Sequence, residues 1–347
     1  MTEDRRRTTE NWGLLGNEWA VEMLKQHLTH DSVRHAYLFS GPAGLGRRTL
    51  ALRLAQALNC PHPVAPAEPC GTCQTCRQIE RMQYPDLAVI QAEKEGGILK
   101  VEQIRTIRQS LVLKPYQGSY RVALFLRFQE ANANAANALL KTLEEAPVYV
   151  VLVLTADAPE QLLPTIVSRC EVLRLRPLPV ETVEAFLKER GAAPTDARLL
   201  AHISGGRPGY ALRLMQDKDA LKFRADRLED LQKLLQSTRR ARFAYAEKLT
   251  DRKNEKSEAK ERLRETLLLW LSFWRDVLLC RAGAQNPLAN VDRLAEIEAL
   301  AGRLSLPEAR RLVLAAEGAI DQLERNVNPR LLVEVLLLDW PREEKSF

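Results

Sequence analysis

GPAGLGRRT, residues 41–49, joins an apolar run to an amphipathic segment. The run before it, Ala36 to Phe39, has the composition of a buried strand, and Arg48 to Leu58 carries apolar residues at helical spacing. A glycine-rich turn between a strand and a helix is where backbone amides fold around phosphate groups. The sequence therefore predicts an α/β domain with a phosphate-binding loop that includes Gly41, Gly44, Gly46 and Arg47.

This loop lacks two side chains that hydrolysis requires. A working phosphate loop places Lys after its last glycine, to reach the β- and γ-phosphates, and then Ser or Thr, to ligate magnesium. Arg47 and Arg48 hold these positions, and Thr49 lies one residue too late. A later apolar strand, Val122 to Leu126, runs into Arg127 where a carboxylate is needed. We expect a nucleotide-binding fold that has lost ATP hydrolysis, with weak nucleotide binding or none.

Strand and helix patterns alternate along the first half of the chain, as in a doubly wound parallel sheet. Further strands are expected at Leu87–Ile90, Val150–Thr155 and Glu171–Leu175, and further helices at Val101–Leu111 and Asn134–Glu145. After Pro177 and Pro179 the pattern is all-helical, with helices expected at Val180–Arg190, Thr195–Ile203, Pro208–Met215, Glu265–Cys280 and within Val291–Trp340. The predicted domains are residues 1–177, 178–217 and 218–347.

Four of the six cysteines lie close together, at Cys60, Cys70, Cys73 and Cys76. The gaps of two residues let successive sulfur atoms face one ion, and four thiolates complete a tetrahedral shell. This donor set predicts a structural zinc module over residues 60–80, with iron–sulfur ligation as the alternative. His62 is then expected to be a loop residue, because the shell is already full.

Composition and charge exclude several classes of protein. The chain has 347 residues, is 46% apolar and 28% charged, and carries a net charge of +6, which favours a globular protein of two or three domains. We expect no membrane span and no secretory signal, because no apolar run is long enough and residues 1–7 are charged. A cytoplasmic location is therefore predicted.

Residues 239–264 hold ten basic and five acidic residues, typical of a solvated helical hairpin or, alternatively, of a nucleic-acid grip.

Four segments of the chain are distinctive: LGNE at 15–18, HAYLFSG at 35–41, NALLKTLEEAP at 137–147 and LPTIVSRC at 163–170. Together they resemble the bacterial clamp-loader family of AAA+ proteins, which belongs to DNA polymerase III. The resemblance covers nearly the whole chain and implies an AAA+ domain with a zinc module, a three-helix lid and a C-terminal helical collar. It implies a non-hydrolysing subunit, because the motor's acidic motif would fall on Leu126 and Arg127 and its lid arginine near Gly209, unless Arg207 substitutes. The chain also ends soon after the collar, without the extension expected for binding a helicase or polymerase.

The resemblance further implies that Arg169, within Ser168-Arg169-Cys170, is an arginine finger that acts in trans on ATP held by a neighbouring motor subunit. Thr155 matches the family's polar sensor position, and Cys170 is expected to be a small buried residue. The implied partners are the motor (gamma/tau) subunits, the opener (delta) subunit, the sliding clamp and primer-template DNA, in a hetero-pentamer. The alternatives are a motor-type ATPase with substituted catalytic residues and a zinc-containing DNA-binding module that uses residues 239–264.

Overall fold

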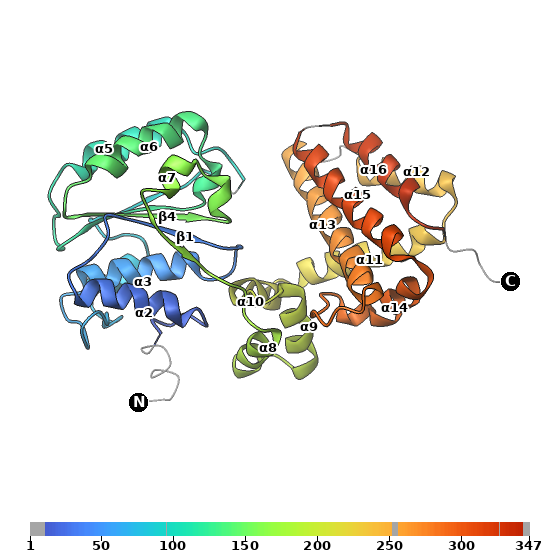
Figure 1. Cartoon of the computed structure of the whole chain (residues 1–347), viewed down its shortest axis with the longest axis horizontal. Coiled ribbons are helices and arrows are strands. Elements are labelled where there is room, and N and C mark those ends of the chain that lie inside the picture. The colour runs from blue at the N-terminus through green and yellow to red at the C-terminus, as the bar shows by residue number, and fades with distance from the viewer. Residues whose placement is uncertain (1–10, 95, 252–255, 326, 343–347) are drawn as a thin grey trace. The chain divides into compact units, whose positions relative to one another are not determined.

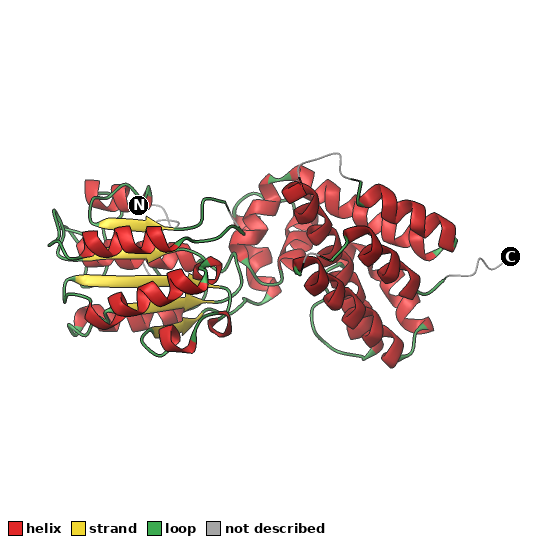
Figure 2. Ribbon diagram, turned by 90° about the horizontal axis from the view of Figure 1, so that it is seen from above, coloured by secondary structure: helices red, strands yellow, loops and turns green. Residues whose placement is uncertain are grey.

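A five-stranded sheet forms the centre of the first of two units into which the chain divides. All neighbouring strands are parallel and lie in the order β2-β3-β4-β1-β5, with helices on both faces (Figure 2). The strands are β1 (Ala36–Ser40), β2 (Leu87–Ile90), β3 (Arg121–Phe125), β4 (Val150–Ala156) and β5 (Glu171–Arg174). The computed structural model describes residues 11–94, 96–251, 256–325 and 327–342. The predicted doubly wound α/β fold is confirmed.

Two separate cores hold the helices to the two faces of this sheet. On one face, α2 (Glu18–Thr29) and α3 (Arg47–Asn59) pack on β-strand side chains such as Phe39 and Val153 (Figure 1). On the other face lie α5 (Val101–Leu111), α6 (Ala133–Glu145) and α7 (Pro164–Val167), with Leu38 and Leu152. Every residue of β4 is buried, because helices cover both faces of a parallel sheet. The short elements are α4 (Gln74–Glu80), η1 (Phe128–Glu130) and η2 (Pro159–Gln161).

The third strand ends one residue earlier than its apolar pattern predicts. Leu126 lies beyond β3, and Arg127 follows it with φ 51°, in the left-handed region. A residue with this backbone conformation cannot continue an extended strand, so the chain turns here and enters η1. The turn sets the position of Arg127 at the carboxyl edge of the sheet.

The second unit comprises residues 179–206 and 211–347 and, among its described residues, contains helices and no strand. Two lid helices pack together, α8 (Val180–Glu189) and α9 (Pro194–Ser204), and α10 (Pro208–Gln216) follows. The remaining elements are α11 (Lys218–Leu235), α12 (Arg239–Leu249), α13 (Lys256–Arg281), η3 (Val291–Arg293), α14 (Leu294–Arg303), α15 (Leu306–Glu324) and α16 (Pro329–Asp339). Trp340 packs edge-on against Trp270 and Trp274, with ring centroids 4.9 and 5.6 Å apart. The predicted helical bundle is confirmed.

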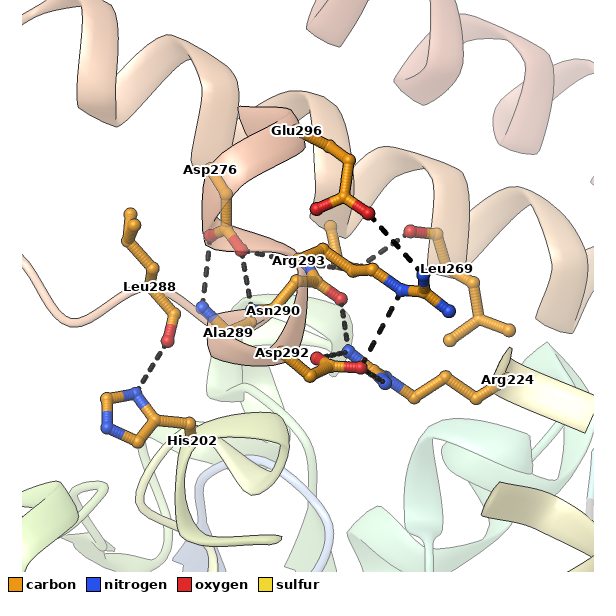
Figure 3. Close-up of polar contacts among 11 residues, drawn as sticks. His202, Arg224, Leu269, Asp276, Leu288, Ala289, Asn290, Asp292, Arg293 and Glu296 are labelled. Carbon is orange, nitrogen blue, oxygen red and sulfur yellow. Dashed lines mark hydrogen bonds and ion pairs between the residues drawn. The ribbon is translucent and has the colours of Figure 1, made fainter. Parts of the chain in front are cut away.

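A buried polar network orders the loop that leads into η3 (Figure 3). Asp276 accepts hydrogen bonds from the backbone of Ala289 and Asn290, at 3.1 and 2.7 Å. Arg224 donates to both carboxylate oxygens of Asp292, at 2.8 and 2.7 Å, and to the Asn290 side chain. Buried polar groups are costly unless they are paired, so these contacts fix one conformation of the loop.

None of the helices in the described residues is both long enough and apolar enough to cross a membrane.

Candidate functional site

The predicted phosphate loop lies where the sequence places it, between β1 and α3. Gly46 precedes the first turn of α3 with φ 92°, and Gly44 has φ 93°. A Cβ atom on Gly44 would lie 2.8 Å from the backbone nitrogen of Tyr210, so this position requires glycine. The Gly41 amide is directed at the end of β4, where the carbonyls of Ala156 and Asp157 lie 3.2 and 3.1 Å away.

Arg47 opens α3 but is not free to meet a phosphate. Its side chain is only 8% exposed, and its Nη2 donates to Oδ1 of Asp157 at 2.7 Å. Among the described residues no protein atom accepts a hydrogen bond from its buried Nη1. Arg48, where a magnesium ligand is needed, is exposed and carries a cation. The loop therefore keeps its backbone shape, while its one buried cation is paired within the chain.

The segment Arg207–Tyr210 lies against this loop in the first unit. The Gly209 amide donates to the Gly44 carbonyl at 2.9 Å. The Arg207 guanidinium stacks on the Tyr210 ring, 4.5 Å from its centroid. The Gly209 contact ties the backbone of the loop at Gly44 to this segment.

The carboxyl end of β3, which β4 separates from β1 in the sheet, carries an ion pair in place of a metal-binding acid. Arg127 donates through Nε to Oε1 of Glu130 at 2.8 Å, and its backbone N–H donates to Oγ1 of Thr155 at 2.9 Å. Thr155, the predicted sensor position, is 3% exposed and also donates to the Phe125 carbonyl. Glu130 is the first acid after the strand, and Arg127 and the Gly96 amide share its Oε1 atom.

The Ser168-Arg169-Cys170 turn contrasts with this loop because its arginine is accessible. Arg169 is 37% exposed; its Nη2 donates to Oε1 of Glu144 at 2.6 Å and its Nη1 to the Thr165 carbonyl at 2.9 Å. Ser168 turns its hydroxyl to the same Thr165 carbonyl, at 3.2 Å. Cys170 is half-buried, and this burial raises the pKa of its thiol to about 12, so it stays protonated at neutral pH.

The four clustered cysteines come together as their spacing predicts. Their sulfur atoms all lie within 4.8 Å of one another, with 3.6 Å between Cys60 and Cys70 and 4.0 Å between Cys70 and Cys76. Four sulfur atoms at about 2.3 Å from one tetrahedral ion lie roughly 3.8 Å apart. The cluster can therefore hold a metal ion. His62 is exposed beside it, as expected for a loop residue.

Backbone amides are directed at these sulfur atoms and favour thiolates. The amides of Cys70, Cys73 and Cys76 each donate to the preceding cysteine of the cluster, at 3.4, 3.3 and 3.4 Å. Burial opposes ionisation of Cys70, but hydrogen bonds from the Cys73 and Thr72 amides outweigh it and lower its pKa to about 6. Burial raises the pKa of Cys76. A bound cation would offset that cost, since metal coordination requires deprotonated sulfur.

Comparison with known proteins bears directly on the role of these features. The family model described as "DNA polymerase III, delta subunit" matches residues 16–179, and "DNA polymerase III, delta subunit, C terminal" matches residues 218–342. DNA polymerase III subunit delta' of Bacillus subtilis is 30% identical over 318 residues, which cover 92% of this chain and 94% of that protein. The chain belongs to the delta-prime family of clamp-loader subunits.

Other relatives support delta-prime over the motor-subunit alternative. Delta' of Pseudomonas aeruginosa is 39% identical over 205 residues, 58% of this chain and 61% of that protein. Subunit tau of Escherichia coli is 36% identical over 207 residues, but they make up only 32% of its length. The tau match thus covers a smaller part of both chains than the Bacillus delta' match.

In this delta-prime-family chain, part of the basic segment 239–264 is already engaged by protein groups. Arg242 is 4% exposed and donates to backbone carbonyls that include those of Leu234, Leu337 and Trp340. Arg264 pairs with Glu324 at 3.0 Å. Residues 252–255 lie outside the described residues. Arg242 is thus taken into the helical bundle, whereas Arg264 remains 40% exposed in a surface ion pair.

The sequence analysis missed two acids that pair with the site arginines. Asp157 pairs with Arg47, and Glu144 pairs with Arg169. Asp157 directly follows β4, and β4 pairs with β1, which leads into the phosphate loop. Because carboxyl ends of parallel neighbours meet at one edge, knowledge of the strand order would have placed this acid beside the loop. Glu144 lies inside the matched segment 137–147, but nothing in its spacing indicates a contact with Arg169, which is 25 residues away.

Proposed function

We propose that this chain is a non-hydrolysing clamp-loader subunit that presents Arg169 to ATP bound in a neighbouring motor subunit. The observation that carries the proposal is the contrast in exposure between two arginines. Arg47, at the chain's own phosphate loop, is 8% exposed and paired with Asp157, whereas Arg169 remains 37% exposed. Membership of the delta-prime family supports the clamp-loader role.

The absence of hydrolysis follows from the charges at the loop. Phosphoryl transfer needs a point charge at the β- and γ-phosphates, a hydroxyl ligand for magnesium and a carboxylate that helps to hold the metal. Asp157 neutralises Arg47, Arg48 repels a divalent cation, and Arg127 stands where the carboxylate would be. The contact between Gly209 and Gly44 further narrows the space around the loop. Nucleotide binding through the loop amides is accordingly weak or absent.

Arg169 acts instead on the neighbour's nucleotide. Its guanidinium offsets the negative charge that develops on the transferred phosphoryl group, and such a finger is worth about 10³-fold or more in rate at the site it serves. Arginine suits this role because it stays protonated and offers a planar fork of donors. The ring neighbour that receives it is a gamma/tau-type motor subunit.

Assembly into a hetero-pentamer uses the helical collar. One face of α16 exposes Leu331, Val335 and Leu338 by 56, 55 and 44%, while Leu332 and Leu336 of the same helix are buried. This exposed stripe at helical spacing fits the apolar helix face of a related subunit's collar. The assembly includes the opener (delta) subunit and acts in the cytoplasm on the sliding clamp and primer-template DNA.

We propose zinc as the ion of the four-cysteine module. Four thiolates within 4.8 Å of one another suit a single tetrahedral ion, whereas an iron–sulfur cluster must also fit several irons and sulfides between its cysteines. With no open ligand position the metal is structural. It fastens the end of α3, where Cys60 lies, to α4, where Cys76 lies.

The decisive experiment measures ATP hydrolysis by the motor and opener subunits, stimulated by primer-template DNA and clamp, with and without this chain. The native chain should raise the rate, and Arg169→Ala should remove that gain without releasing the chain from the complex in gel filtration. Arg174→Ala is the matched control, because Arg174 is another exposed arginine paired with an acid, Glu160, at 2.9 Å. Equal rates with native chain and Arg169→Ala would disprove the finger.

A further inference from the structure

We propose that Glu144 is a positioning residue that orients the Arg169 finger; this inference rests on the function proposed above. Glu144 lies in the last turn of α6, and its Oε1 accepts a hydrogen bond from Arg169 Nη2 at 2.6 Å. The Thr165 carbonyl in α7 accepts from Nη1 at 2.9 Å. Two acceptors from two different helices thus engage the two terminal nitrogens of one guanidinium.

This arrangement fixes the plane of the guanidinium and still leaves donors for a phosphate. An arginine has five N–H bonds, so two contacts leave three. The remaining N–H bonds, one on each terminal nitrogen and one on Nε, suffice for a bidentate contact with phosphate oxygens. Glu144 therefore does not need to release Arg169 when the finger engages.

The supports of this clamp are themselves held by the core. Leu143, beside Glu144, is 2% exposed, and Ile166, between Thr165 and the finger, is fully buried. Helix α6 packs against α7, so the two acceptors keep their spacing. Glu144 itself is 51% exposed, and exposed ion pairs add little to stability. The effect of the pair is therefore on the position of Arg169 rather than on folding.

The expected gain comes from ordering a flexible side chain before it meets its target. A misplacement of about 1 Å can reduce a rate on the order of 100-fold. With the Thr165 contact still present, loss of Glu144 should be milder, about tenfold at the site that Arg169 serves. The loss should fall on kcat and not on KM for ATP, because ATP is bound by the neighbouring subunit.

The test compares full complexes that contain Glu144→Ala, Glu144→Gln, Arg169→Ala or the double variant Glu144→Ala/Arg169→Ala. Glu144→Ala should lower kcat, and Glu144→Gln should recover most of it, because the amide oxygen still accepts from Nη2. The double variant should be no slower than Arg169→Ala alone, since Glu144 acts only through Arg169. Glu160→Ala is the control: it removes the exposed acid that pairs with Arg174 and should leave kcat unchanged.

The outcomes separate this inference from the function on which it rests. If Arg169→Ala slows the complex but Glu144→Ala does not, the finger stands and the positioning role is wrong. If Glu144→Ala speeds hydrolysis, Glu144 restrains the finger instead, which also overturns the inference. If Arg169→Ala itself has no effect, both proposals fail. A slower double variant than Arg169→Ala would show that Glu144 acts elsewhere.

Discussion

Arg47 and Arg169 lie in the same α/β unit and make similar ion pairs, yet they are suited to opposite tasks. Their contacts to a carboxylate measure 2.7 and 2.6 Å. They differ in exposure, which is 8% for Arg47 and 37% for Arg169. Breaking a buried pair leaves a charge without water or partner, whereas an exposed arginine can take a further ligand at little cost. Burial, and not the pairing itself, is therefore what distinguishes the two arginines.

Metal removal should have the largest effect on stability. It should destabilise the helix that carries Arg47 but not the turn that carries Arg169. Helix α3 begins at Arg47 and ends beside Cys60, while the Arg169 turn belongs to the opposite face of the sheet. A zinc chelator should destabilise α3 and α4 on the order of 4 kcal/mol, because binding energy of a structural metal is also folding energy. Hydrogen exchange of α3 peptides should accelerate, and that of α7 peptides should not.

Metal analysis provides the control for that measurement. The purified chain should contain one zinc per molecule and no visible absorption from iron–sulfur chemistry. Cys280→Ala should retain the metal, because Cys280 lies in the other unit, outside the cluster. Equal acceleration of α3 and α7 would show that the module supports the whole unit rather than one side.

Removal of the two acids should sharpen the comparison directly. Asp157→Ala leaves Arg47 buried without its partner and should cost about 2 kcal/mol, less than a fully buried pair because Asp157 is 45% exposed. Glu144→Ala should cost at most about 0.5 kcal/mol. Hydrogen exchange of α3 and α6 in the two variants measures both values. Similar costs for the two variants would mean that burial does not distinguish these arginines.

The predictable part of this molecule is its local and periodic part. The bounds of β2 and α5 coincide with their predictions, Leu87–Ile90 and Val101–Leu111, since a doubly covered strand is uniformly apolar and an amphipathic helix repeats every few residues. The cysteine cluster was predictable for a similar reason, because short gaps bring three of its sulfur atoms together. Helix α4 was missed, although Cys73 caps it, because metal-ligand spacing dominates that segment.

The unpredicted part depends on neighbours distant in sequence. Arg47 and Asp157 are 110 positions apart in the sequence, and they meet only because β1 lies beside β4 in the sheet. Glu144 meets Arg169 only because α6 packs against α7. Composition and periodicity do not predict contacts between residues that are distant in the sequence. The domain bounds 1–177, 178–217 and 218–347 remain predictions.

The second unit contains another buried arginine, Arg224, whose ion pair can be compared with that of Arg47. This pair should also make the stability of the unit depend on pH. Arg224 is 7% exposed and bonds both oxygens of Asp292. Burial opposes ionisation of Asp292, but the Arg224 hydrogen bond outweighs it and lowers the pKa of this carboxyl. A lowered pKa stabilises the fold above the unfolded value, about 3.9, and this contribution is lost as pH falls through the folded value.

Asp292→Asn should therefore cost about 1.5 kcal/mol at neutral pH, since Asp292 is 30% exposed and partly screened. The gap between the native chain and the variant should begin to shrink at about pH 3, because this lies below the unfolded value of about 3.9, so that the unfolded carboxyl takes up a proton before the folded one does. Denaturant unfolding of the helical unit at both pH values tests this. A gap that does not change with pH would indicate that the cost comes from neutral hydrogen bonds.

The smallest effect should come from giving the phosphate loop its usual side chains. In Arg47→Lys/Arg48→Thr the loop regains a compact ammonium and a hydroxyl, yet Leu126 and Arg127 still supply no carboxylate for magnesium. The Gly44 carbonyl also still accepts from Gly209. Phosphate release by the isolated variant should therefore stay at the background of the native chain, with a motor subunit as positive control. Turnover by this variant would mean that Arg47 and Arg48 alone prevent hydrolysis. The missing carboxylate at Leu126 and Arg127 would then not be a reason for the inactivity of the loop.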